Sequence, residues 1–174
     1  DSESPLTDVN TMSALLKTPG EILDGISIQK PDEIVITTIM RDGSDDAITR
    51  QALKHRSDSL SQVLRDADVS PGDFVPIHLP TCTDFLVATI AVFKAGGTPM
   101  PVSERLPDSE LAQLLALAEP KVIISRTLTA PVVLNPADFE ASASSPSNLP
   151  VLISNPIKAL ASGGSTGKPK LIIT

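Results

Sequence analysis

The segment that most constrains the fold is residues 84–94, which are apolar on nearly every side of a helix. Such a helix must be buried, because no face of it is suited to contact with water. Gly96 and Gly97 follow as a stop signal, and Lys94 stands at the negative end of the helix dipole. The segment is also well short of the roughly 18 apolar residues that cross a membrane. It predicts a helix at the centre of a globular domain, and no membrane span.

Strand-like apolar runs flank this helix and recur along the chain. They lie at residues 34–39, 74–80, 98–102, 122–124, 132–134 and 151–153. Apolar residues at helical spacing predict helices over residues 50–67 and from Pro107 to Ala118. Two short helical pieces are predicted within residues 9–30, broken by Pro19 and Gly20. Strands that alternate with helices of about 10 to 15 residues predict an α/β fold with a largely parallel sheet and flanking helices.

Turn residues refine this outline. Residues 47–49 are the predicted hairpin partner of residues 34–39, across a turn at Asp42 and Gly43. The prolines within residues 74–80 predict an edge strand or a kink, because proline cannot donate to a sheet. The stretch 138–150 is rich in Ser, Ala and Pro and predicts a solvent loop.

The composition narrows the choice of partners. The chain has 174 residues, a net charge of −7, no Trp or Tyr, and only four Phe. It offers neither a positive field nor an aromatic stacking platform, so no nucleic-acid partner is expected. The single cysteine, Cys82, excludes an internal disulfide and a cysteine-based zinc site, and its apolar neighbours predict a buried structural thiol. Residues 1–8 are acidic and polar, unlike a signal peptide, and predict a disordered tail on a cytoplasmic protein.

A second feature points to a ligand. Residues 161–170, Ala-Ser-Gly-Gly-Ser-Thr-Gly-Lys-Pro-Lys, contain three glycines, three hydroxyls and two lysines. Glycines let backbone N–H groups form a concave anion nest, hydroxyls donate to phosphate oxygens, and lysine adds positive charge. A flexible Gly/Ser linker is the plainer alternative, but Pro169 between two lysines favours a shaped loop. We therefore predict a phosphate-binding loop.

The spacing disfavours two common phosphate loops. A Walker A motif has four residues between its first glycine and Gly-Lys-Ser/Thr, whereas Gly163 has only three before Gly167, and Pro169 follows Lys168. The dinucleotide fingerprint Gly-x-Gly-x-x-Gly has a different first interval and opens a helix, which this segment does not. A P-loop NTPase and a dinucleotide-binding fold are therefore both disfavoured.

Residues 162–170 closely resemble the phosphate loop of the AMP-forming, adenylate-forming superfamily, which includes acyl-CoA synthetases, luciferases and the adenylation domains of peptide synthetases. Two further segments resemble that superfamily in the same order: Pro-Gly-Asp at residues 71–73, before an apolar strand, and Lys-Ala-Gly at residues 94–96, at the end of the buried helix. The family usually has glycine after the Pro-Lys pair. This chain has Leu171 there, a variant similar to bile-acid-CoA-ligase-like members.

The resemblance implies ATP-dependent activation of a carboxylic acid to an acyl-adenylate, with release of pyrophosphate and later transfer to a thiol. CoA is the first candidate thiol, and the phosphopantetheine of a carrier protein, loaded by a peptide-synthetase adenylation domain, is the alternative. Mg²⁺ is expected with ATP, and no catalytic or metal-binding residue is assigned. Lys168 occupies a position that the family leaves variable. The phosphate-binding residues implied by the resemblance are Ser162, Gly163, Gly164, Ser165, Thr166, Gly167 and Lys170.

The same resemblance implies that residues 9–174 are the first part of the large N-terminal, ATP-binding domain of such an enzyme, truncated after the phosphate loop. The family's adenine and ribose contacts, acyl pocket and C-terminal catalytic lysine would follow Thr174, so we expect the 174 residues alone to be inactive. The remaining alternative is a non-catalytic, truncated nucleotide-binding module.

Other polar residues are expected to be structural. His55 lies on the polar side of a predicted helix and His78 within a predicted strand, and neither has a carboxylate at triad or ligand spacing. The remaining candidates are carboxylates without a paired arrangement, expected in turns and on solvated faces: Asp45, Asp46, Asp66 and Asp68.

Overall fold

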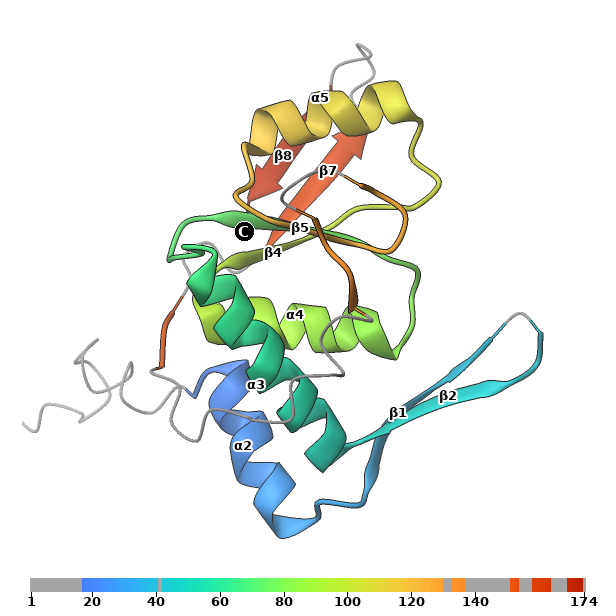
Figure 1. Ribbon diagram of the computed structural model, residues 1–174, viewed down its shortest axis with the longest axis vertical. Coiled ribbons are helices and arrows are strands. Elements are labelled where there is room, and N and C mark those ends of the chain that lie inside the picture. Colours follow the sequence, from blue (N-terminus) through green and yellow to red (C-terminus); the bar gives the residue numbers. More distant parts are fainter. Residues whose placement is uncertain are drawn as a thin grey trace, which may run out of the picture.

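The computed structural model describes residues 17–40, 42–129, 133–136, 151–153, 158–163 and 169–173. Their centre is a parallel sheet of four strands in the order β4-β3-β5-β6. Helices α3 and α4 cover one face of this sheet, and α5 lies over the other (Figure 1). The predicted α/β fold with a largely parallel sheet and flanking helices is therefore confirmed. The strands are β3 (Phe74–His78), β4 (Thr98–Pro101), β5 (Ile123–Ser125) and β6 (Val133–Leu134), and the helices are α3 (Arg50–Asp66), α4 (Thr83–Ala95) and α5 (Asp108–Ala118).

The apolar helix of the sequence is α4, and it is buried as predicted. Ala91, Val92 and Ala95 have no exposed surface. The helix packs between α3 and the sheet in the larger of two hydrophobic clusters. It ends at Gly96, whose φ of +87° is the left-handed conformation of a helix C-cap.

Replacing Gly96 tests this helix end. We expect Gly96→Ala to be destabilised by more than the about 1 to 2 kcal/mol of a left-handed alanine, because the new Cβ would lie 2.9 Å from the Leu152 Cβ. Gly72→Ala is the control, since Gly72 also has a positive φ but has nothing within 4 Å of an added Cβ. Urea unfolding measures both variants. Equal losses would contradict the close approach to Leu152.

Strand β3 corrects one prediction. It lies between β4 and β5, and Pro76 is fully buried, so the prolines do not mark an edge strand. The Ile77 carbonyl accepts from the Val102 N–H on the β4 side. Because alternate residues of a central strand bond to opposite neighbours, the Pro76 nitrogen turns toward β5. The ladder between β3 and β5 begins at Ile77 and Ile124, so the missing N–H falls just before it.

Helix α2 (Pro19–Gln29) confirms the second predicted helical piece and corrects its start. The sequence predicts a break at Pro19 and Gly20, but the helix begins there. Pro19 takes the first helical position, where its missing N–H is harmless. Thr18 and Glu21 form a capping box, in which Glu21 N donates to Thr18 Oγ1 (3.2 Å) and Thr18 N donates to Glu21 Oε2 (2.7 Å).

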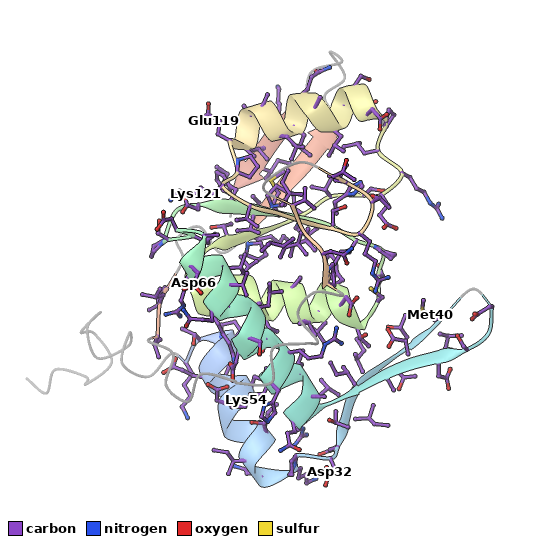
Figure 2. The ribbon with its side chains drawn as sticks, viewed as in Figure 1. Asp32, Met40, Lys54, Asp66, Glu119 and Lys121 are labelled. Atoms are coloured by element: carbon purple, nitrogen blue, oxygen red, sulfur yellow. The ribbon has the colours of Figure 1, made fainter. Side chains whose placement is uncertain are left out.

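Strands β1 (Ile34–Ile39) and β2 (Asp45–Thr49) form the predicted antiparallel hairpin, which projects from the body of the fold (Figure 1). Met40, labelled in Figure 2, lies at the end of this projection, where Gly43 N donates to its carbonyl. Asp46 is not on a solvated face as predicted. Its Oδ2 accepts from Thr83 N (3.1 Å) and Thr83 Oγ1 (2.7 Å), so it caps α4 from the hairpin. The other three carboxylates of that prediction are exposed: Asp45, Asp66 and Asp68.

One predicted strand is wrong. Residues 151–153 are described and are not in a strand; Val151 and Ile153 are exposed, and Leu152 lies against the Gly96 turn. A three-residue apolar run forms a strand only where a neighbouring strand pairs with it. The predicted tail at residues 1–8, the first helical piece before α2 and the predicted solvent loop at 138–150 lie outside the described residues.

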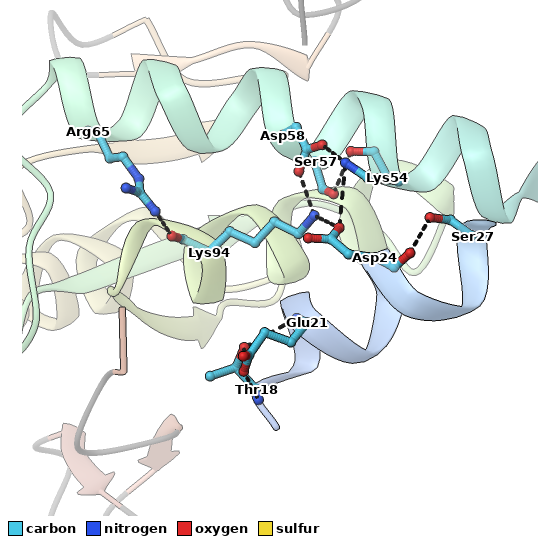
Figure 3. A network of polar contacts seen from close by, with 9 residues as sticks. All are labelled: Thr18, Glu21, Asp24, Ser27, Lys54, Ser57, Asp58, Arg65 and Lys94. Carbon is cyan, nitrogen blue, oxygen red and sulfur yellow. Dashed lines mark hydrogen bonds and ion pairs between the residues drawn. The ribbon is translucent and has the colours of Figure 1, made fainter. Parts of the chain in front are cut away.

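A group of four charges, of which Asp58 and Lys94 are buried, joins α2, α3 and α4 (Figure 3). The Nζ of Lys94 lies 2.5 Å from Asp58 Oδ1 and 2.8 Å from Asp24 Oδ1. The Nζ of Lys54 lies 2.5 Å from Asp58 Oδ2. Burial lowers the pKa of Lys54, but the hydrogen bond and charge of Asp58 outweigh burial and raise it. Lys94 therefore holds α2 against the two helices that cover the sheet.

Candidate functional site

The predicted phosphate loop belongs to an antiparallel hairpin. Strand β7 (Ala159–Gly163) pairs with β8 (Pro169–Ile173), with Ala159 opposite Ile173 and Gly163 opposite Pro169. Proline is tolerated as the first residue of a strand, where its missing N–H does little harm to the ladder. The turn at residues 164–168 lies outside the described residues, and with it four predicted site residues: Gly164, Ser165, Thr166 and Gly167.

The structure brings the other three predicted site residues together at the end of this hairpin. Ser162 lies directly opposite Lys170, and Gly163 lies in the closing pair next to the turn. Lys170 is exposed, whereas the following residue, Leu171, packs into the interior. Because strand side chains alternate between faces, Lys170 points to the outer face of the hairpin. The stem thus presents a cation beside the turn, where it can neutralise a bound anion.

A second hydrophobic cluster holds the stem of the hairpin against the sheet. Strand β7 runs beside β4, and β8 runs beside α5 (Figure 1). Leu171 packs against the cluster from β8. The fold therefore holds the stem of the hairpin in place. The buried members of this cluster come from β4, α5 and β7 and the residue that follows β4: Met100, Val102, Leu111, Leu114, Ala118 and Ala159.

The sequence carries a strand signal in β8 but none in β7. The run from Leu171 to Ile173 is apolar and ends in two β-branched residues, which is typical of a strand. Strand β7 has only Leu160 as a large apolar residue and ends in Ser-Gly, so its composition gives no strand signal. The usable signal is the glycine-rich segment itself, since a short turn with glycine between two segments is typical of a hairpin.

The histidines and the cysteine lie where structural residues are expected. His78 is buried at the end of β3, with its Nδ1 3.2 Å from Ser125 Oγ at the end of β5. His55 is on the exposed side of α3. Cys82 is a free, buried thiol directly before α4. Within the described part of the chain, no group of three or more His, Cys, Asp or Glu residues could hold a metal ion.

An acidic residue in the first turn of α4 joins this helix to α3 and to the end of β5. Asp84 is nearly buried and accepts hydrogen bonds from both Arg56 and Arg126. Burial raises the pKa of the Asp84 carboxyl, but the hydrogen bonds from the two guanidinium groups outweigh burial and hold it below its ordinary value. Asp84 is therefore ionised at neutral pH and ties the two elements together.

We expect Asp84→Asn to lose about 2 kcal/mol of stability at pH 7, the size of hydrogen bonds to a charged group. Because the folded-state pKa of Asp84 lies below that of the unfolded chain, its stabilisation is complete above about pH 4 and is lost as the pH falls through the folded-state value. The difference from wild type should therefore shrink in acid. Asp108→Asn, in the first turn of α5, is the matched control. A difference that stays constant down to pH 2 would contradict the assignment.

Comparison with known proteins adds independent findings. The family model described as "AMP-binding enzyme" matches residues 27–174. The D-lysergyl-peptide-synthetase subunit 1 of Claviceps purpurea (strain 20.1) is 31% identical over 143 residues, which is 74% of this chain. The solved N-terminal subdomain of Klebsiella oxytoca NpsA, in complex with 3-hydroxyanthranilyl-AMSN, has a TM-score of 0.73 and 28% identity over 91% of this chain. NpsA-ThdA, an artificially fused adenylation-PCP di-domain from the same organism, also has a TM-score of 0.73, at 27% identity over 91% of this chain.

These matches cover most of this chain but a much smaller share of each of the other proteins. The chain spans 4% of the length of the Claviceps synthetase, 40% of the NpsA subdomain chain and 32% of the fused di-domain. None of the helices that the structure describes is both long enough and apolar enough to cross a membrane.

Proposed function

The chain belongs to the AMP-binding enzyme family, and we propose that it contributes the phosphate-binding part of a peptide-synthetase adenylation domain. Such a domain activates a carboxylic acid with ATP and passes the acyl group to a carrier protein. The observation that carries the proposal is the family match across residues 27–174, which includes the whole β7–β8 hairpin and its glycine-rich turn.

The first step joins two anions, so positioning and charge neutralisation are what the protein must supply. The carboxylate oxygen forms a bond to the α-phosphorus of ATP, the bond from that phosphorus to the bridging oxygen breaks, and pyrophosphate leaves. Ser162, Ser165, Thr166 and the backbone of Gly163, Gly164 and Gly167 would donate to the β- and γ-phosphates. Lys170 would neutralise the loop and its phosphates from the stem. Mg²⁺ would be held as part of the ATP complex.

The second step transfers the acyl group to a thiol. The thiol sulfur attacks the acyl carbon, and AMP leaves. A carrier-protein phosphopantetheine is favoured over CoA because the relative with 31% identity is a peptide synthetase and a similar solved structure is an adenylation-PCP di-domain. We further propose that the 174 residues bind the phosphates of ATP through the β7–β8 hairpin.

Acyl transfer by the complete gene product tests the choice of thiol. The protein is incubated with ATP and an activated acid, and then with a carrier protein bearing phosphopantetheine or with free CoA. We expect a thioester on the carrier protein. A carrier protein whose modified serine is replaced by alanine is the control and should remain unloaded. Acyl-CoA as the product would instead indicate an acyl-CoA synthetase, and no thioester with either thiol would support a non-catalytic module.

A further inference from the structure

We propose that Leu171 is a positioning residue for the ATP phosphates, an inference that rests on the proposed function. Leu171 directly follows Lys170 in β8 and packs, partly buried, against the cluster that contains Met100 of β4 and Leu114 of α5. Neighbouring strand residues point to opposite faces, so a Leu171 side chain fixed in this cluster sets the direction of the Lys170 side chain. Leu171 would thus act through Lys170 without touching the nucleotide.

Ala159 gives the hairpin a second anchor on the same face. The register places Ala161 opposite Leu171, and Ala159 lies two residues before Ala161 on the same side of β7. Ala159 has no exposed surface and belongs to the same cluster as Met100 and Leu114. A larger side chain at position 159 is expected to displace its neighbours, because protein interiors are closely packed. Two anchors on one face set both the distance and the tilt of the hairpin against β4 and α5.

A small change at these anchors should reach the turn. At about 3.4 Å per residue, Ala159 lies about 14 Å along β7 from Gly163, so a tilt at the base of the hairpin moves its tip. A misplacement of about 1 Å at a reacting group can lower the rate by about a hundredfold. The cluster therefore controls phosphate binding from outside the site, through the stem of the hairpin.

Leu171→Ala in the complete gene product tests the first anchor. We expect the Kd and the KM for ATP to rise by about tenfold to a hundredfold, the range for losing one hydrogen bond to a charged group, with little change in the KM for the acid. Leu128→Ala is the matched control, because Leu128 is also a partly buried leucine of this cluster but is not in the hairpin. It should lower the unfolding temperature similarly and leave the Kd for ATP unchanged. Equal effects of both variants on ATP binding would overturn the proposal.

Ala159→Val tests the second anchor and keeps the proposal falsifiable if Leu171→Ala fails to fold. Ala91→Val is its control, since Ala91 is equally buried but lies in the other hydrophobic cluster. We expect weaker ATP binding only for Ala159→Val. The Kd for ATP also separates the proposed function from the proposed positioning role of the hairpin anchors. A wild-type protein that binds ATP but forms no acyl-adenylate would refute the proposed function alone, and unchanged ATP binding in both Leu171→Ala and Ala159→Val would refute the positioning role alone.

Discussion

Asp58→Ala should lower the free energy of unfolding by about 3 to 5 kcal/mol, one of the two largest effects expected in this protein. The Asp58 side chain is 3% exposed and lies 2.5 Å from the Nζ atoms of both Lys94 and Lys54. Without it, the one carboxylate that Lys94 keeps among the described residues is Asp24, whose side chain is 45% exposed. A buried ammonium group that loses its main partner keeps the unfavourable free energy of leaving water.

Asp66→Ala is the control for this variant, because Asp66 is on the same helix and is exposed (Figure 2). We expect a change of less than about 0.5 kcal/mol there. A double variant, Asp58→Leu with Lys94→Met, should be less destabilised than the sum of the two single variants, since it removes both buried charges. Chemical denaturation of the complete gene product at pH 7 measures all five variants, including the singles Asp58→Leu and Lys94→Met. A loss in Asp58→Ala no larger than that in Asp66→Ala would contradict the role of the buried charges.

Lys170→Ala should lower the rate of acid-dependent pyrophosphate exchange by about a hundredfold, the size expected when one preorganised donor to developing charge is lost. Lys170 is exposed on the outer face of the hairpin, opposite Ser162, so its removal should change the site more than the stability of the fold. The exchange rate at saturating acid and the unfolding temperature separate these two effects.

Lys168→Ala is the control, since it removes the same charge two residues away at a position that the family leaves variable. We expect a loss of less than about threefold, as for a screened surface charge. If both lysine variants lose activity equally, the loop acts through its summed charge, and the assignment of a specific role to Lys170 is wrong.

The sequence predicts those parts of the fold where local pattern and tertiary environment agree. Helix α4 is apolar on nearly every side and is bounded by Gly96, so its sequence predicts burial. The β1–β2 hairpin follows from a β-branched run and a glycine turn. At Pro76 the missing donor predicts an edge strand, whereas the sheet places that missing donor just before a ladder begins.

The buried charges could not be predicted from the sequence because they depend on which helices meet. Asp58 lies on the polar side of α3 when that helix is considered alone, and Lys94 has a sufficient local explanation at the negative end of α4. The packing of α3 against α4, with α2 beside both, turns these residues inward. For the same reason, the sequence predicts a solvated face for Asp46, although the adjoining start of α4 makes it a helix cap.

In the candidate site, too, the residue types predict the chemistry, whereas the supporting structure depends on tertiary packing. The residue types at 162–170 predict phosphate binding, because glycines, hydroxyls and lysine are what an anion requires. The hairpin that carries them could not be predicted from the composition of β7. This short segment forms a strand only because it lies beside β4 and pairs with β8. Leu171 likewise has a role that only the packing reveals.

Exchange of labelled pyrophosphate into ATP by the complete gene product, measured against a panel of amino acids and other carboxylic acids, tests the central claim most directly. Formation of an acyl-adenylate predicts exchange that requires one class of acid and disappears without it. Binding of ATP with no exchange for any acid would contradict the claim and would leave the chain as a nucleotide-binding module without turnover.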